Sequence, residues 1–298
     1  TGRRAIRAKY FVDASGDGDL VARCGLPTRR DTEIQPPTTC GILVGLDKVA
    51  RQNKGFSLGQ AVFDPKYPNA LKNGFLWGAS VPGVPGAQMV AGTRVHGADC
   101  SDADQLTRAE LEGRRQLRTI CDIVRENFDG GDQIGLAAIP AQIGIRESRH
   151  AQCLHTLTEQ EVLSGHRFPD AIANGTYRVD IHFPDRPGLV FRYLDGREVT
   201  VVPGQPTKSG RWREPTAENP TFYQVPYRSL VPRGSLNVLV AGRLVDADRG
   251  AFGGVRVMVN CNQMGQAAGT AAWLALRDGI GVADVSPEKL RATLREQG

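Results

Sequence analysis

Two apolar segments near opposite ends of the chain, each ending in a glycine-containing turn, constrain its fold most strongly. Residues 237–242 (Asn-Val-Leu-Val-Ala-Gly) form the continuous apolar run that buried parallel strands show. Residues 5–12 end in Tyr-Phe-Val and predict a second strand, followed by a tight turn from Asp13 to Asp19. The sequence therefore predicts an α/β chain, α+β overall, with backbone turns at the carboxyl ends of its strands.

The turn from Asp13 to Asp19 has three functional interpretations beside an ordinary Gly/Asp turn. A calcium loop fails because Cys24 stands where a bidentate glutamate is required. A dinucleotide fingerprint is incomplete because Val21 follows Gly16 and Gly18 at the position of the third glycine. The third is a strand-end turn that lets the backbone approach a nucleotide whose phosphate-binding turn lies elsewhere in the sheet.

The second unit continues from Gly242 into a stretch rich in glycine. Residues 249–256 predict a flexible loop, and Asn260 predicts the N-cap of a helix that ends near Gly279. The free N–H groups and positive dipole end of such a helix suit an electron-rich or anionic ligand. The alternative is a Gly/Ala-rich helix that simply packs on a sheet.

The residues between these units predict a different kind of structure. Helical spacing predicts a long helix capped by Ser101 and ending near Phe128. Residues 179–183, 189–193 and 198–202 alternate like antiparallel strands, and Asp195-Gly196 is a hairpin turn signal. A last helix is expected to open at Ser286.

Composition excludes several classes. The net charge of +5 is dispersed without a block of like charges, so no nucleic-acid partner is expected. No stretch reaches the roughly 18–20 apolar residues of a membrane-spanning helix. The six cysteines lack CxxC spacing and the five histidines lack HExxH, so we expect free thiols, a reducing cytoplasmic compartment and no metal.

Three segments together resemble FAD-dependent oxidoreductases of the glutathione-reductase-like class. They are AKYFVDASGDGDLVARCGLP (8–27), IGIRESRHAQCLHTLTEQEV (143–162) and NVLVAGRLVDADRGAFGGVRVMVNCNQMGQAAGTAA (237–272). LTRAELEGRRQ (106–116) and YQVPYRSLVP (223–232) are also similar to that family.

The resemblance implies FAD as the cofactor and a set of cofactor-binding residues. The turn at the first strand would approach the dinucleotide, and the second unit would pass the pyrophosphate, ribityl chain and flavin ring. The helix after it would aim its N-terminus at the flavin N1/C2 edge. The cofactor-binding residues so implied are Ala14, Ser15, Gly16, Asp17, Gly18, Gly242, Arg243, Asp246, Gly253, Gly254, Val255, Arg256 and Gly265.

The resemblance also divides the chain. Residues 1–35 and 231–298 would belong to a partial Rossmann-like FAD domain, and residues 36–230 would form a substrate or cap domain with antiparallel strands. The expected activity is hydride transfer from a small-molecule substrate to flavin N5. The alternatives are a flavin-dependent hydroxylase or halogenase, and a non-catalytic flavoprotein subunit that needs a partner chain.

Four residues are candidates for the substrate site. Arg146, Glu147 and Arg149 lie in the stretch Arg-Glu-Ser-Arg, whose guanidinium groups could orient an anionic substrate. The alternative for them is an ion-pair network. His182, in a predicted strand, is the candidate general base, and the alternative is a structural histidine with both nitrogens satisfied.

One departure from the family is large. Such proteins hold the FAD pyrophosphate on a strand, GxGxxG turn and helix, and the sequence contains no such unit. We therefore expect that a further segment of the same protein, or a second chain, supplies it. Residues 1–298 alone are expected to bind FAD weakly or not at all.

Overall fold

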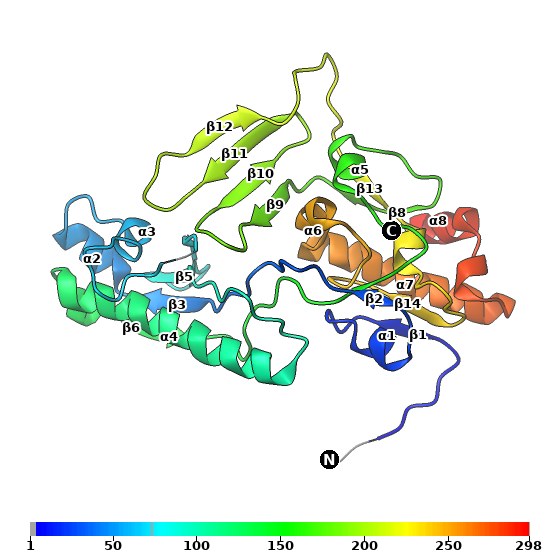
Figure 1. The fold of residues 1–298 in the computed structure, drawn as a ribbon, viewed down its shortest axis with the longest axis horizontal. Coiled ribbons are helices and arrows are strands. Elements are labelled where there is room, and N and C mark those ends of the chain that lie inside the picture. The colour runs from blue at the N-terminus through cyan, green and yellow to red at the C-terminus, as the bar shows by residue number, and fades with distance from the viewer. Residues whose placement is uncertain (1–3, 73, 298) are drawn as a thin grey trace.

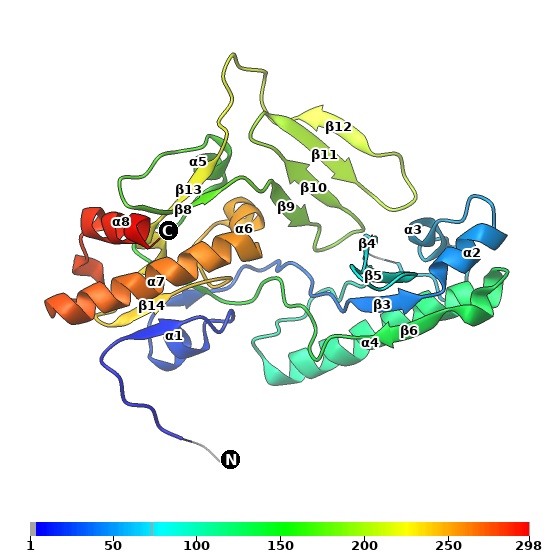
Figure 2. The ribbon, with the colours of Figure 1, turned by 180° about the vertical axis from the view of Figure 1, so that it is seen from behind.

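The structure is a computed structural model that describes residues 4–72 and 74–297 (Figure 1). Helices and several mainly antiparallel sheets make up the described residues, which confirms the predicted α+β class. One group of elements surrounds α7 (Met258–Asp278) and α8 (Pro287–Glu296), and a second surrounds α4 (Ala103–Asn127) (Figures 1 and 2). A sheet formed by residues 179–211 lies beside both groups. The segments that lead into β3 (Gly41–Val44) and out of β6 (Gly135–Ala138) run between the two groups.

The two strands predicted near the ends of the chain are neighbours. β1 (Phe11–Asp13) pairs in parallel with β14 (Val238–Val240), with Phe11 opposite Val238 and Asp13 opposite Val240. β14 is buried throughout, as its unbroken apolar sequence predicts. β1 is shorter than expected, because residues 5–10 form no strand.

The buried carboxylate of Asp13 fixes the turn after β1. One oxygen accepts hydrogen bonds from the Ser15 backbone N–H (3.0 Å) and hydroxyl (2.7 Å), and the other accepts from the Val21 N–H (3.0 Å). α1 (Asp19–Arg23) starts directly after Gly18, whose φ of 66° is left-handed. An aspartate at this position therefore holds both the turn and the first turn of the following helix.

The glycine-rich stretch after β14 is the main error of the sequence analysis. Residues expected to be a flexible loop form α6 (Arg249–Val255), which Asp248 caps by accepting a hydrogen bond from the Ala251 N–H (2.9 Å). The next helix, α7 (Met258–Asp278), begins before Asn260, with Val257 as its N-cap. The glycines of α6 serve close packing, since a Cβ on Gly253 would lie 2.8 Å from the Asp180 carbonyl oxygen.

α7 and the elements around it enclose the larger hydrophobic core. Fully buried side chains there include Tyr223, Phe252, Leu239 and Met264. α7 contacts β8, β14 and α8 (Figure 2). The bounds of the remaining elements of this group are β2 (Thr28–Arg29), β7 (His150–Ala151), α5 (Glu159–Leu163), β8 (Ala171–Gly175), β13 (Tyr223–Pro226), the 3-10 helices η2 (Tyr227–Leu230) and η3 (Val282–Asp284), and α8 (Pro287–Glu296).

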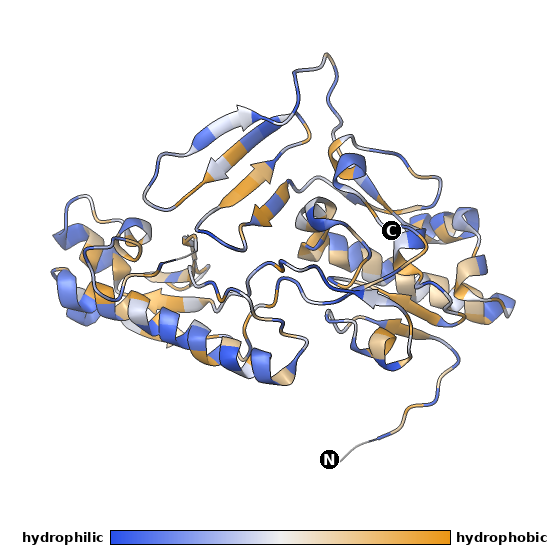
Figure 3. Ribbon diagram, viewed as in Figure 1, coloured by the Kyte–Doolittle hydropathy of each residue, from blue (hydrophilic) through white to orange (hydrophobic). Residues whose placement is uncertain are grey.

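A second core lies between α4 (Ala103–Asn127) and the sheet β4-β5-β3-β6. Hydrophilic and hydrophobic residues alternate along α4, as an amphipathic surface helix requires (Figure 3). Asp102, not the expected Ser101, caps it by accepting from the Gln105 N–H (2.9 Å), because the Ser101 hydroxyl donates to Asp99 instead. The other bounds here are β3 (Gly41–Val44), α2 (Leu46–Gln52), α3 (Leu58–Ala61), β4 (Trp77–Ser80), β5 (Ala87–Ala91), η1 (Gly131–Gln133) and β6 (Gly135–Ala138).

The predicted antiparallel hairpins form the sheet β9-β10-β11-β12. Its strands are β9 (Val179–His182), β10 (Leu189–Arg192), β11 (Arg197–Val201) and β12 (Lys208–Arg211). Its edge strand β9 packs on α6 and so ties the sheet to the larger core.

The larger core gathers residue 21 and residues between 151 and 290, and the second core gathers residues between 43 and 134. The domain limits at 35/36 and 230/231 stay a prediction.

Within the described residues, neither α4 nor α7 nor any other helix combines the length and apolarity needed to cross a bilayer.

Gly253→Ala should destabilise the protein because its methyl group would press on the backbone of β9. We expect the free energy of unfolding to fall by about 1–3 kcal/mol. Gly269→Ala is the matched control, since it also lies in a helix but has no atom within 4 Å of the added carbon. It should raise stability by about 0.5–1 kcal/mol. Urea unfolding of both variants measures this, and equal midpoints would contradict the close packing.

Candidate functional site

The turns after β1 and β14 meet at the carboxyl ends of these paired strands. Gly16 has a φ of 84°, and a Cβ there would collide with the Arg243 guanidinium group. Arg243 in turn faces Asp17, with Nη2 3.4 Å from Oδ1. The Ser148 hydroxyl donates to the same Asp17 oxygen (2.6 Å). Glycine is required at residue 16 by both its backbone conformation and this close approach.

The other residues of the two turns differ in exposure. Ala14 and Ser15 are exposed, whereas Gly16 and Gly18 are buried. Gly242 has a φ of 91° and no atom within 4 Å of where a Cβ would stand. Open space beside a strand-end glycine is what a closely approaching ligand needs.

The start of α7 carries no side-chain cap. Val257 is the N-cap and accepts no hydrogen bond through its side chain, while Met258 and Val259 are 83% and 65% exposed. Further along this face, Gly265 is exposed with no atom within 4 Å of an added Cβ. The uncapped N–H groups and the open glycine fit the electron-rich edge of a planar cofactor.

Four residues implied as cofactor-binding are buried within the protein. Asp246 is 1% exposed, and its carboxylate accepts from the Cys153 N–H (2.7 Å) and the Thr156 hydroxyl (3.1 Å). Gly253, Gly254 and Val255 are buried inside α6, and the Gly254 carbonyl accepts from the Tyr223 hydroxyl (2.9 Å). The predicted loop is wrong, because three of these residues lie in a helix that packs against β9 and β13; their contact with FAD stays a prediction.

The structure separates the predicted substrate-site residues. Arg149 turns to the β1 turn, where it pairs with Asp19 (3.2 Å) and donates to the Gly18 carbonyl (3.4 Å). Glu147 is buried against His150. Arg146 and His182 instead lie in a central group that we call the arginine cluster, made of Gln35, Arg94, Arg146, His182 and Arg256.

Hydrogen bonds connect the arginine cluster. Arg94 Nε donates to His182 Nδ1 (3.4 Å), and the Arg94 and Arg146 guanidinium groups both donate to the Thr38 hydroxyl. Gln35 Oε1 accepts from the His182 N–H (3.2 Å) and from Arg256 Nη2 (3.3 Å). The cluster thus joins the segment after β5, strand β9 and the end of α6.

The cluster is rich in positive charge, and this changes its titration. Burial lowers the pKa of Arg94 to about 10. Burial and then the neighbouring Arg94 and Arg256 lower the pKa of Arg146 well below its usual range. Burial, followed by these guanidinium groups, also lowers the pKa of His182 far below that of an ordinary imidazole. His182 is therefore neutral at physiological pH.

The hydrogen-bond partners of His182 also define its tautomer. Because Arg94 Nε is a donor, Nδ1 must be the accepting nitrogen, and Nε2 carries the proton 3.4 Å from Asp180 Oδ1. The basic lone pair of His182 is thus occupied by Arg94. This arrangement suits a positioning residue better than the general base that the sequence suggested.

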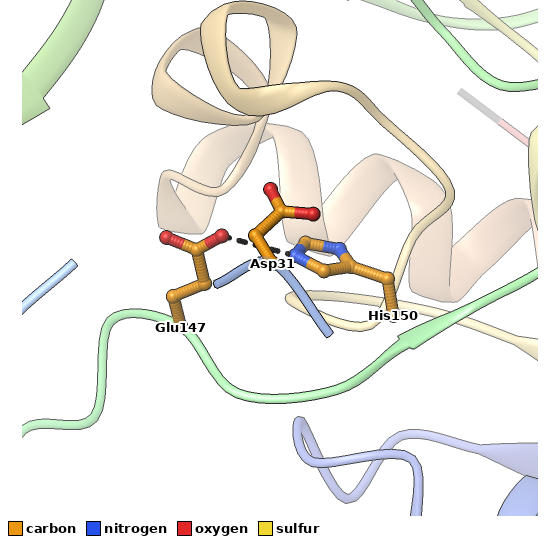
Figure 4. Close-up of side chains that lie close together, drawn as sticks. All are labelled: Asp31, Glu147 and His150. Atoms are coloured by element: carbon orange, nitrogen blue, oxygen red, sulfur yellow. Dashed lines mark hydrogen bonds and ion pairs between the residues drawn. The ribbon is translucent and has the colours of Figure 1, made fainter. Parts of the chain in front are cut away.

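Three side chains with metal-ligand spacing lie nearby among the described residues. Oxygen or nitrogen atoms of Asp31, Glu147 and His150 lie within 4.8 Å of one another (Figure 4). Arg29 pairs with Asp31 (2.6 Å), and Glu147 faces His150 Nε2 (3.3 Å). Glu147 also accepts a hydrogen bond from the Gln35 N–H (2.9 Å), so both carboxylates already have partners within the protein.

The comparison with protein-family models decides the family. The model described as FAD dependent oxidoreductase matches residues 1–294. The chain belongs to the FAD-dependent oxidoreductase family. No curated protein and no solved structure matched it. The match to the family model confirms the predicted FAD-dependent oxidoreductase family and FAD as the cofactor.

The sequence analysis missed Gln35 and Arg94. Both lie in stretches rich in Gly and Pro with poor periodicity, so no motif marked them. Their only distinctive feature is burial, because Gln35 is 0% and Arg94 3% exposed. Burial of a polar side chain far from any motif appears only in the tertiary structure.

A pH-dependent loss of stability should follow from His182. The unfolded chain binds a proton there below about pH 6.5, whereas the folded protein does not. The free energy of unfolding should therefore decrease from pH 7 to pH 5, by up to about 1.4 kcal/mol per pH unit. His182→Asn should flatten this slope in urea unfolding. The same substitution at exposed His166 is the control and should keep the wild-type slope; an unchanged slope in His182→Asn would contradict the assignment.

Proposed function

We propose that this protein oxidises a small molecule by transferring a hydride from a substrate carbon to flavin N5. When bound, FAD supplies the two-electron acceptor for this reaction. The observation that carries the proposal is the parallel pairing of β1 with β14, which brings the turns at Gly16 and Gly242 together beside the uncapped start of α7.

Different parts of the structure would bind the cofactor and the substrate. The Gly16 turn and Arg243 would bear against the dinucleotide, and the N–H groups of the first turn of α7 would stabilise negative charge on the flavin edge. The arginine cluster, which Arg256 connects to the start of α7, would bind and orient the substrate. His182 would keep Arg94 in place, because its Nδ1 accepts the hydrogen bond from Arg94 Nε.

We also propose that a further strand, glycine turn and helix complete the FAD site, either from the same protein or from a second chain. β1 is one strand of a two-stranded parallel sheet, and Val12 on it is 36% exposed. Parallel sheets are normally covered and longer than this. One face of α7 is also exposed, including Trp273 (50%) and Leu276 (48%). A strand at β1 and a helix on α7 would cover both surfaces.

The direct test is the flavin content of residues 1–298. After dialysis, the chain should retain far less than one flavin per molecule, as measured by visible absorbance. A chain that bears a GxGxxG unit should co-purify with it or restore flavin binding. Retention of one flavin per chain without any partner would contradict this part of the proposal.

Substitution of Gly16 should weaken FAD binding further. Gly16→Ala would displace Arg243, and we expect the Kd for FAD to rise about tenfold or more, equivalent to about 1.4 kcal/mol. Gly25→Ala is the matched control, since Gly25 also has a left-handed φ (72°) but no atom within 4 Å of the added carbon. FAD titration of each variant together with the GxGxxG-bearing segment or chain, followed by quenching of flavin fluorescence, measures both. Equal affinities of the two variants would place the Gly16 turn away from the cofactor.

A further inference from the structure

The arginine cluster contains buried hydrogen-bond donors that have no partner. They are Gln35 Nε2, Arg94 Nη2 and Arg256 Nε. Native proteins satisfy nearly all buried polar atoms, so three such donors in one place need an explanation. A buried donor without an acceptor is costly, and it commonly marks a group reserved for a ligand.

These three donors belong to one hydrogen-bonded network. Gln35 and Arg256 are joined through Gln35 Oε1, which also accepts from the His182 N–H. Arg94 joins the same histidine through its ring nitrogen. Gln35 and Arg94 each bond to His182 of β9, and Arg256 bonds to Gln35, so the three side chains that carry the unpartnered donors belong to one network.

The net positive charge of the cluster favours a negatively charged ligand. Arg94, Arg146 and Arg256 carry three positive charges. Asp180 faces them, with Oδ2 3.8 Å from Arg256 Nη2, and its Oδ1 has no hydrogen-bond partner. Among the described residues, neither Arg94 nor Arg146 forms an ion pair with a carboxylate. Buried guanidinium groups without a counter-ion favour an anion strongly.

We propose that the arginine cluster binds the carboxylate of a small organic acid, which would be the substrate class of the proposed oxidation. That the bound acid is the substrate rests on the proposed function, whereas carboxylate binding by the cluster does not. A carboxylate offers two oxygens with about four lone pairs, enough to accept hydrogen bonds from three donors. Its planar shape also suits the fork of a guanidinium group.

Space for the rest of such an acid lies beside Arg94. A cavity of about 470 Å³ is lined by Arg94 and His96, together with Lys72 and Gln116. This volume falls in the range of small-ligand sites. His96 donates from Nδ1 to the Pro184 carbonyl (2.6 Å), and its Nε2, which is an acceptor in this tautomer, has no partner.

Thermal unfolding of the flavin-free chain tests the proposal. Acetate and succinate, added at constant ionic strength against chloride, should raise the unfolding midpoint of the wild-type protein. Acetamide and succinamide, which have similar shapes but no charge, should not. An equal response to the amides would overturn the proposal.

Variants locate the binding. Arg94→Met and, independently, Arg256→Gln should raise the apparent Kd for succinate tenfold or more. Arg118→Met is the matched control, because the Arg118 side chain lies on α4 and is 83% exposed; it should respond like the wild type. If either cluster variant folds and keeps the wild-type Kd, the cluster is not the site.

A comparison with inorganic phosphate distinguishes a carboxylate ligand from a phosphoryl ligand. Stabilisation by phosphate but not by succinate, lost in Arg94→Met, would overturn the carboxylate assignment in favour of a phosphoryl group. Carboxylate binding in a chain that never binds FAD would sustain this inference while the proposed function failed. FAD binding without carboxylate binding would give the opposite result, so the two failures are distinguishable.

Discussion

The parallel pairing of β1 with β14 is the interaction on which the rest of the structure depends. Three residues on each strand join segments from opposite ends of the chain. The Asp13 carboxylate then fixes the turn after β1, and α7 packs along the pair. A shift of this register by one residue would turn the buried Asp13 of β1 to the face where Val12 is exposed, and would displace the turns at Gly16 and Gly242 from one another.

The centre of the molecule is organised by buried charge. Asp246 and Glu147 each satisfy neighbouring backbone N–H groups, those of Cys153 and Gln35, and so hold the segments that cross between the two groups of elements. The arginine cluster differs because its guanidinium groups outnumber the carboxylates near them. Such an excess costs free energy in the ligand-free protein and is reasonable where a ligand later supplies the negative charge.

Much of the fold could be predicted from local sequence. The hairpins of β9 to β11, the short helix α1 and the Ser286 cap of α8 follow directly from alternation, turn residues and capping signals. The stretch from 249 to 256 could not be predicted, because its three glycines and the aspartate before it, Asp248, suit a loop and a tightly packed helix equally. Only the backbone of β9 lying against Gly253 decides between them.

The sequence by itself determined the family, the cofactor and the two strands that end in glycine turns, because these depend on residues adjacent in the chain. The tertiary structure alone decided which charged residues act together. Arg146 and Arg149 are close in sequence but point to different places, while Gln35, Arg94, His182 and Arg256 come from four distant segments. Burial and the balance of charge are properties of the space around a side chain, and local sequence does not encode that space.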